Sequence, residues 1–258
     1  MPLALPTVTL LTATGATVDG ALTALRLSMR GIEFAAVKLL APEAPATLPA
    51  GITHVTIPPM DLNGYNRLVL NDLHRHFTTA HCLIVQADGF VLDPARWQDA
   101  FLDYDYVGAP WEPRLPMDGS RGGFELGANR VGNGGFSLRS HRLAATVAAL
   151  DVAARRLPLQ SEDLVICHYL YGELAAMGLR FAPLELAAQF SMECPYHLCG
   201  QTLGTVFGFH GKHLLPEVSF RLRCAELDRL GARAATLPCP CGSRRRYGDC
   251  HGRPGTQP

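Results

Sequence analysis

The stretch HCLIVQADGFVLDP, residues 81–94, predicts a buried strand that ends in polar residues. Its apolar run, Cys82–Val85, has the length of a strand that is covered on both faces. The run ends at the polar residues Gln86 and Asp88, and the chain turns apolar again at Phe90. An amide and a carboxylate therefore stand at the carboxyl end of a predicted core strand. In an open parallel sheet, ligands bind at that end of the strands.

The segments before this strand alternate between strand-like and helix-like patterns. A strand, a helix, two strands and a second helix precede it, and Gly31 is a predicted helix end. This β-α-β-β-α-β order predicts an α/β fold, with a mostly parallel mixed sheet flanked by helices. The predicted strands are 7–13, 34–42 and 53–60, and the predicted helices are 19–32 and 65–81.

The segments after the strand continue the alternation. Asp93 is a predicted N-cap, with Pro94 at the first position of a short helix. The stretch 112–133 is rich in Gly, Pro and Arg, and a loop of this length is more often functional than idle. Strands are predicted at 105–111 and 134–140 and helices at 141–156, 161–178 and 217–233, and residues 179–193 are predicted to return to the sheet.

Length and composition suit one α/β domain with a small appendage. The chain has 258 residues, of which 48% are hydrophobic and 18% charged, and its formal net charge is zero. This balance implies no general attraction to nucleic acid or anionic membrane. The N-terminus has no signal-peptide pattern, and no apolar run is long enough for a membrane span. We expect a cytoplasmic protein, whose eight cysteines are thiols or metal ligands.

The polar end of the central strand suggests two interpretations. Gln86 and Asp88 are two residues apart, so within a strand they would project from the same face. A carboxylate placed there can hold a divalent cation, and the cation can hold a diphosphate. The alternative is a plain turn, in which Asp88 bonds local backbone amides.

Several blocks together resemble a bacterial family of uncharacterised glycosyltransferase-like domains, DUF5672. They are HCLIVQADGFVLDPARWQDAFLDYDYVGAPW, VGNGGFSLRS, SEDLVICHYL and QFSME, and the similarity covers about residues 5–215. The resemblance implies a GT-A-like (Rossmann-like) nucleotide-sugar transferase fold. Such enzymes carry an acidic D-x-D motif that binds Mn²⁺ or Mg²⁺ and, through it, the sugar nucleotide. Gln86 replaces the first acid here, which leaves Asp88 as the expected carboxylate ligand and His210 as a further one.

The resemblance also implies catalytic and substrate-binding residues. Glu162 and Asp163 resemble the acidic pair from which an inverting transferase draws its general base, and Asp163 is the first candidate. The alternative is that both acids only complement the dipole of a helix N-terminus. Asn133, Gly134 and Gly135 correspond to a glycine segment that lines the sugar and acceptor pocket. A tight turn is the competing interpretation.

Five further residues are candidates for substrate or cofactor contacts. Asp105 would face the acceptor, and Trp111 would stack on a sugar ring, although a buried core tryptophan is the equally good alternative. Thr12, at the end of the first strand, would contact the nucleoside. Asn66 and Arg67 would contact the base or the diphosphate.

The last residues carry the sharpest motif in the chain. Cys239, Cys241, Cys250 and His251 are a tetrahedral zinc-ligand set, and the stretch resembles the SEC-C motif. About twenty residues are too few for a core, so metal binding would supply the folding energy. We expect a zinc-binding module at 236–258 that docks a protein or RNA partner through its arginines.

These observations predict a metal-dependent glycosyltransferase domain at 1–235 followed by the zinc module. It would use a nucleotide-sugar donor and an acceptor of unknown class: glycan, lipid or protein. The rival hypothesis is a non-catalytic nucleotide- or glycan-binding protein on the same fold, recruited through its zinc tail. A nucleotidyltransferase is a third possibility, but the N-terminus lacks the basic, glycine-rich phosphate loop that such chemistry needs.

Overall fold

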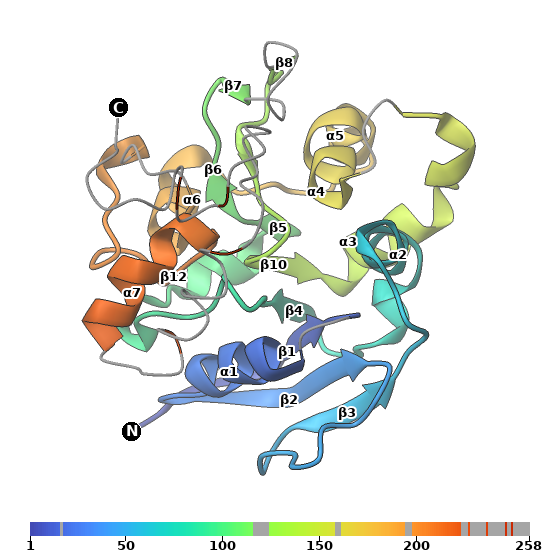
Figure 1. Ribbon diagram of the computed structural model, residues 1–258. Coiled ribbons are helices and arrows are strands. Elements are labelled where there is room, and N and C mark those ends of the chain that lie inside the picture. Colours follow the sequence, from blue (N-terminus) through green and yellow to red (C-terminus); the bar gives the residue numbers. More distant parts are fainter. Residues whose placement is uncertain are drawn as a thin grey trace.

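A six-stranded sheet organises the computed structural model (Figure 1). The structure describes residues 1–15, 18–115, 124–157, 161–193 and 198–222, with the single residues 227, 236, 246 and 249. The strands of this sheet are β1 (Leu3–Ala13), β2 (Ile32–Ala41), β3 (Thr53–Thr56), β4 (His81–Ile84), β5 (Tyr106–Val107) and β10 (Ser137–Ser140).

The strand order β3-β2-β1-β4-β10-β5 confirms the predicted mostly parallel mixed sheet. Strands β3, β2, β1 and β4 are mutually parallel, whereas β10 runs antiparallel to both β4 and β5. The opening apolar run lies in the middle of this sheet, because β4 pairs with β1 on one side and β10 on the other. Its carboxyl end therefore lies beside the start of β10.

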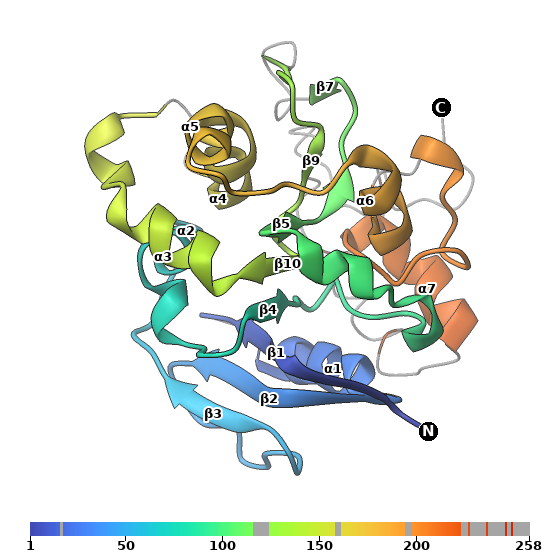
Figure 2. The same ribbon diagram turned by 180° about the vertical axis from the view of Figure 1, so that it is seen from behind.

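Both faces of the sheet are covered by helices, as the alternation of side chains requires. Leu10 and Leu83 point to one face, where α1 (Val18–Ser28) and α7 (Leu215–Leu222) pack. Leu11 and Cys82 point to the other face, where α2 (Leu62–Arg67) and α3 (His141–Ala149) pack. Figure 2 shows these two helices from behind. This two-sided burial explains why the strand reads as a continuous apolar run.

Two predicted helices differ in detail from their predictions. The helix predicted at 65–81 begins at Leu62, because the Asp61 side chain caps it by accepting a hydrogen bond from Gly64 N–H. The helix then passes through a π-helical turn at 68–72 and ends at Arg75. The helix predicted at 161–178 consists of α4 (Glu162–Leu164), a π-helical turn at 165–169, and α5 (Tyr171–Ala176). Asp93 caps its short helix as predicted, accepting from Ala95 N–H.

The prediction that residues 179–193 return to the sheet is confirmed only at Phe181, which forms a parallel bridge with Tyr106 of β5. The residues after it form α6 (Leu184–Phe190) and then β11 (Ser191–Met192). Strand β11 pairs in parallel with β12 (Gly208–Phe209), in a small sheet of its own. The other short strands pair in two antiparallel couples: β6 (Ala109–Pro110) with β9 (Val131–Gly132), and β7 (Arg114–Leu115) with β8 (Phe124–Glu125).

No helix among the described residues is long and apolar enough to cross a membrane.

Candidate functional site

The chain turns sharply just after β4. Gln86 N–H donates to the Gly89 carbonyl (2.8 Å) and Gly89 N–H donates to the Gln86 carbonyl (3.0 Å), which closes a tight turn with Asp88 inside it. Because β4 ends at Ile84, the expectation that Gln86 and Asp88 share one strand face is wrong. The backbone forms the plain turn of the alternative interpretation. The Asp88 carboxylate faces another part of the chain.

That other part is the carboxyl end of the small parallel sheet. Met192 is paired with Phe209, so the next residues, Glu193 and His210, leave the ends of neighbouring strands side by side. Glu193 Oε1 lies 3.3 Å from His210 Nδ1, and Asp88 Oδ1 lies 3.7 Å from His210 Nε2. The structure therefore brings together Asp88 and His210, which are far apart in the sequence, and adds Glu193.

The His210 ring is held between two glycines. A Cβ atom on Gly135 would lie 2.1 Å from His210 Nε2, and one on Gly89 would lie 2.8 Å from Cδ2, so neither position has room for a side chain. The ring keeps 20% of its surface exposed. Burial opposes its charge, but Asp88 and Glu193 outweigh burial and raise the pKa of His210 to about 9.

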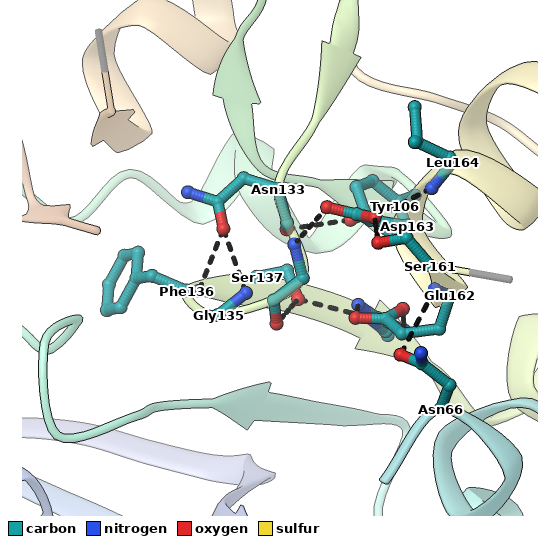
Figure 3. A network of polar contacts seen from close by, with 12 residues as sticks. Asn66, Tyr106, Asn133, Gly135, Phe136, Ser137, Ser161, Glu162, Asp163 and Leu164 are labelled. Atoms are coloured by element: carbon teal, nitrogen blue, oxygen red, sulfur yellow. Dashed lines mark hydrogen bonds and ion pairs between the residues drawn. The ribbon is translucent and has the colours of Figure 1, made fainter. Parts of the chain in front are cut away.

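The segment Asn133–Gly135 makes a tight turn (Figure 3), and its Gly135 lies directly beside the His210 ring. Asn133 has a positive φ of 74°, a conformation that asparagine tolerates better than most residues. Its Oδ1 accepts from Gly135 N–H at 2.8 Å, and its carbonyl accepts from the Tyr106 hydroxyl at 2.8 Å. Asn133 is fully buried, so its side chain shapes the turn instead of meeting a substrate as predicted.

Asp163 faces the same turn from the start of α4 (Figure 3). Its Oδ2 accepts from Gly134 N–H at 3.1 Å. Its Oδ1 accepts from the Ser161 hydroxyl at 2.6 Å and from Leu164 N–H at 2.8 Å. Ser161 thus holds the acid instead of capping the backbone, and Oδ2 retains one acceptor position for a further proton donor.

Glu162 points the other way and is sealed in the interior. Arg139 Nη2 donates to Glu162 Oε1 at 3.0 Å, Arg139 Nη1 forms an ion pair with Oε2 at 2.7 Å, and the two side chains are only 1% and 3% exposed. Arg139 also lies over the Tyr106 ring, 5.1 Å from its centroid. The structure contradicts the prediction of Glu162 as a base, because both its oxygens are paired with a buried guanidinium.

The helix α2 contributes two residues to the surroundings of Glu162. Asn66 Oδ1 lies 3.4 Å from Glu162 N and accepts its hydrogen (Figure 3). The buried Tyr65 hydroxyl lies among Gln86, Glu162 and Arg139, and burial is the main reason that its pKa is raised. Arg67 itself is exposed at the end of α2, and no contact that the structure shows brings it to this cluster.

Asp105 is not part of the site. Its carboxylate accepts from the Ser140 hydroxyl at 2.5 Å and from Arg180 N–H at 2.8 Å. Ser140 pairs with His81, at the start of β4, whereas the candidate site follows the end of β4. The predicted contact of Asp105 with an acceptor is therefore wrong, because Asp105 ties the opposite edge of the sheet together.

Trp111 and Thr12 are also placed differently from their predictions. Trp111 is 4% exposed, packs in a core with Val131 and Ile166, and donates from Nε1 to Glu193 Oε2 at 2.8 Å. It is the core tryptophan of the alternative interpretation, not a sugar platform. Thr12 is 1% exposed, because β1 extends to Ala13 and keeps it inside the sheet instead of in a nucleoside loop.

The metal predictions have two separate outcomes. Among the residues that the structure describes, no group of three or more His, Cys, Asp or Glu side chains is arranged to hold an ion. Asp88 and His210 are thus a close pair instead of a complete metal centre. The zinc-ligand predictions, Cys239, Cys241, Cys250 and His251, lie outside the described residues.

Sequence reasoning missed Glu193 and the inward orientation of Arg139. Glu193 is the last residue of the block QFSME, which carried part of the family resemblance. The sequence therefore pointed to this segment but assigned no function to Glu193. Arg139 follows Leu138 in a strand buried on both faces, which was the available sign that its guanidinium needed an internal partner.

The fold and site define an α/β protein with polar residues gathered at the ends of parallel strands. The chain belongs to the family described as "Protein of unknown function (DUF5672)", which matches residues 56–210, and a SEC-C motif matches residues 236–253. The predicted resemblance to both is confirmed. A comparison with curated proteins finds no match.

Among solved structures, the chain is similar to the mannosyltransferase PcManGT from Pyrobaculum calidifontis, in complex with GDP-Man and Mn²⁺. The identity is 11% and the TM-score 0.40, over 93% of this chain and 74% of that chain. A likeness this distant carries no argument about activity.

Proposed function

We propose that residues 1–235 form a GT-A-like glycosyltransferase that moves a sugar from a nucleotide-sugar donor to an acceptor, with Mn²⁺ or Mg²⁺ as cofactor. The observation that carries this proposal is the grouping of Asp88, Glu193, His210 and Asp163 around the Asn133–Gly135 turn. Asp88, Glu193 and Asp163 all act on the His210 charge, which places them within electrostatic reach of one ring.

The charge of this grouping supports a requirement for a cation. Glu162 is balanced by Arg139, and His210 balances only one of the acids Asp88, Glu193 and Asp163. Among the described residues, the site therefore carries excess negative charge, which repels a diphosphate. A divalent cation reverses that repulsion and stabilises the departing diphosphate when it is bound.

The residues present fit such an ion only as partial ligands. Asp88 Oδ1 and His210 Nε2 lie 3.7 Å apart, and carboxylate with imidazole is a donor set that suits Mn²⁺. The described residues supply no third ligand in position. Asp88 and His210 would therefore hold the ion together with oxygens of the diphosphate, and metal affinity without nucleotide would be weak.

Asp163 is our candidate for the general base. Its Oδ2 is oriented by Gly134 N–H and keeps one acceptor position, while Ser161 and Leu164 fix Oδ1. An acceptor hydroxyl within hydrogen-bond reach of Oδ2 would give its proton to that oxygen as the sugar is transferred. Gln86, beside the Tyr65 hydroxyl, would contact the nucleotide as a neutral group.

The test is a thermal-shift panel of the full chain with UDP-, GDP-, ADP-, CMP- and TDP-sugars, each with and without Mn²⁺. We expect one donor class to raise the melting temperature only with Mn²⁺, and Asp88→Asn to abolish that shift and the release of nucleoside diphosphate. Asp72→Asn, which removes an exposed acid paired with Arg75, is the matched control and should change neither.

The same panel separates the rival functions. A shift that needs no metal and survives Asp88→Asn would favour a non-catalytic nucleotide or glycan binder. Release of pyrophosphate from a nucleoside triphosphate and a sugar phosphate would favour a nucleotidyltransferase. No shift with any donor would overturn the transferase proposal.

We also propose that residues 236–258 bind one Zn²⁺ through Cys239, Cys241, Cys250 and His251. The SEC-C match to 236–253 supports this ligand set. Elemental analysis of the purified chain should give about one zinc per molecule, and Cys239→Ser should remove it. Cys82→Ser, which alters a buried thiol of the main sheet, should leave the zinc content unchanged. A zinc-free wild type would contradict this assignment.

A further inference from the structure

We propose that Glu193 is a positioning residue for His210, and that Trp111 holds Glu193 in that position. The order is Trp111 to Glu193 to His210, with Asp88 on the far side of the ring. Neither Glu193 nor the polar end of Trp111 belongs to the ligand or base roles proposed above. The inference rests on the proposed function only for its effect on metal and nucleotide binding.

The fold places the three groups with little freedom. Glu193 and His210 directly follow Met192 and Phe209, which are paired across β11 and β12. His210 N–H donates to the Met192 carbonyl at 2.9 Å, which extends the pairing by one residue. Trp111 directly follows β6 and is 4% exposed. The side chains therefore start from ordered backbone.

The hydrogen bonds have only one consistent direction. The Trp111 Nε1–H group is a donor only, and an ionised Glu193 carboxylate is an acceptor only. Glu193 Oε2 accepts from Trp111 at 2.8 Å, and Oε1 lies 3.3 Å from His210 Nδ1. His210 Nδ1 must therefore carry the hydrogen. In the neutral ring the lone pair is then left on Nε2, the nitrogen that faces Asp88.

The position of the ring hydrogen matters because a neutral histidine binds a metal through its unprotonated nitrogen. Carboxylates that accept from the other ring nitrogen commonly fix the tautomer and orientation of such a histidine. Without Glu193, Asp88 would be the carboxylate left beside the ring and would favour a hydrogen on Nε2, with the lone pair on Nδ1, turned away from Asp88. The acid thus decides which nitrogen of His210 is available to a ligand.

Glu193→Gln gives a sharp test because Trp111 restricts how the new amide can lie. The amide oxygen must accept from Trp111 Nε1–H, so the amide NH₂ must face His210 Nδ1. Nδ1 then becomes an acceptor, and the hydrogen moves to Nε2. Trp111→Phe alone should keep the hydrogen on Nδ1, because a carboxylate still only accepts.

The double variant Trp111→Phe with Glu193→Gln should reverse the effect. With no donor at position 111, the amide is free to flip and to accept from Nδ1–H again. This rescue is expected of an orienting role and not of a general loss of packing. Trp97→Phe and Glu173→Gln are matched controls, since Trp97 donates to Asp99 at 3.0 Å and Glu173 pairs with Arg155.

The readout is the ¹⁵N NMR spectrum of histidine-labelled full-length protein, at a pH where the His210 ring is neutral, with His210→Gln for assignment. We expect the Nδ1–H form in the wild type, in Trp111→Phe, in the double variant and in both controls. Glu193→Gln should show the Nε2–H form. The same tautomer in Glu193→Gln and the wild type would overturn the inference.

A second readout separates this inference from the proposed function. Binding of Mn²⁺ in the presence of GDP or UDP, followed by electron paramagnetic resonance, should weaken about 10- to 100-fold in Glu193→Gln and recover in the double variant. No Mn²⁺ binding by the wild type, with the expected tautomers, would contradict metal dependence and leave the positioning role supported. Equal affinity in the wild type and Glu193→Gln would count against the positioning role.

Discussion

Two charged clusters lie on either side of the Gly134–Gly135 backbone, and they differ in their access to water. Arg139 and Glu162 are 1% and 3% exposed and form an ion pair at 2.7 Å. Asp88 and His210 are 15% and 20% exposed, and they meet at 3.7 Å, longer than a hydrogen bond. The first cluster is closed, whereas the second retains unused bonding capacity.

An acidic residue type by itself does not identify a functional carboxylate. Glu162 and Asp163 are neighbours in the sequence, yet one is paired with a buried guanidinium and the other faces the Gly134 turn. A carboxylate in a buried ion pair fixes the positions of the groups around it. A carboxylate that keeps an acceptor position is available for chemistry.

The largest expected effect comes from breaking the closed cluster. Arg139→Met should lower the free energy of unfolding by about 3–5 kcal/mol, because Glu162 would remain buried without its partner. Chemical denaturation of the full chain measures this loss.

The double variant Arg139→Met with Glu162→Leu should recover much of the stability, since an apolar replacement of a buried pair is often neutral. A single variant that costs as little as a surface substitution would show that the pair is not closed.

The open cluster should make the stability of the metal-free protein depend on alkaline pH. The pKa of His210 is raised from its ordinary 6.5 to about 9, so its contribution is fully present below the lower value and is lost as the pH rises through the upper one. The loss should be about 3 kcal/mol.

Denaturation of chelator-treated protein across this pH range, compared with His210→Gln, isolates the effect. The variant should show a flatter pH dependence than the wild type. Parallel curves for the two proteins would contradict the pairing of His210 with Asp88 and Glu193.

The two glycines between the clusters should respond differently to alanine. A Cβ on Gly134 would lie 1.7 Å from Glu162 Oε1, inside the closed cluster, and should cost about 1–3 kcal/mol of stability. A Cβ on Gly135 would meet the His210 ring, whose side chain is 20% exposed. The ring can be displaced toward solvent, so Gly135→Ala should cost less stability.

Unfolding curves measure both variants, and ¹⁵N NMR reports the displacement of His210 in Gly135→Ala. Gly172→Ala is the control, because nothing lies within 4 Å of a Cβ there. Equal costs for Gly134→Ala and Gly135→Ala would remove the proposed distinction between the clusters.

The smallest effect is expected at a third pair, on the surface. Arg155 and Glu173 meet at 2.6 Å, and their side chains are 32% and 37% exposed. Because solvent screens such a pair, Arg155→Met should leave the denaturation midpoint unchanged within error. A loss comparable with that of Arg139→Met would mean that burial does not distinguish these pairs.

The parts of the fold that follow from local pattern could be predicted from the sequence. The apolar run of β4, the helix α1 and the Asp93 cap depend on neighbouring residues, and all three appear in the structure. The prediction for residues 179–193 holds at the Phe181 bridge but not over Leu184–Phe190, which is apolar enough for either a strand or a helix. Only its packing decides between them.

The candidate site was harder to predict because its contacts join distant residues. Nothing near Arg139 in the sequence shows that Glu162 will meet it, and nothing near Trp111 points to Glu193. Asp105 has the same chemistry as Asp88 and also lies near a strand, but at the opposite edge of the sheet. Residue type and spacing therefore identified candidates, and only the topology separated them.

The small β11–β12 sheet has a consequence for the order in which the protein is made. All six strands of the large sheet come from residues 3–140, whereas Glu193 and His210 lie at the ends of β11 and β12. Because chains are synthesised from the N-terminus, all six strands exist before these two side chains and before α7, which covers one face of the sheet. The same late residues therefore complete both the core on that face and the candidate site.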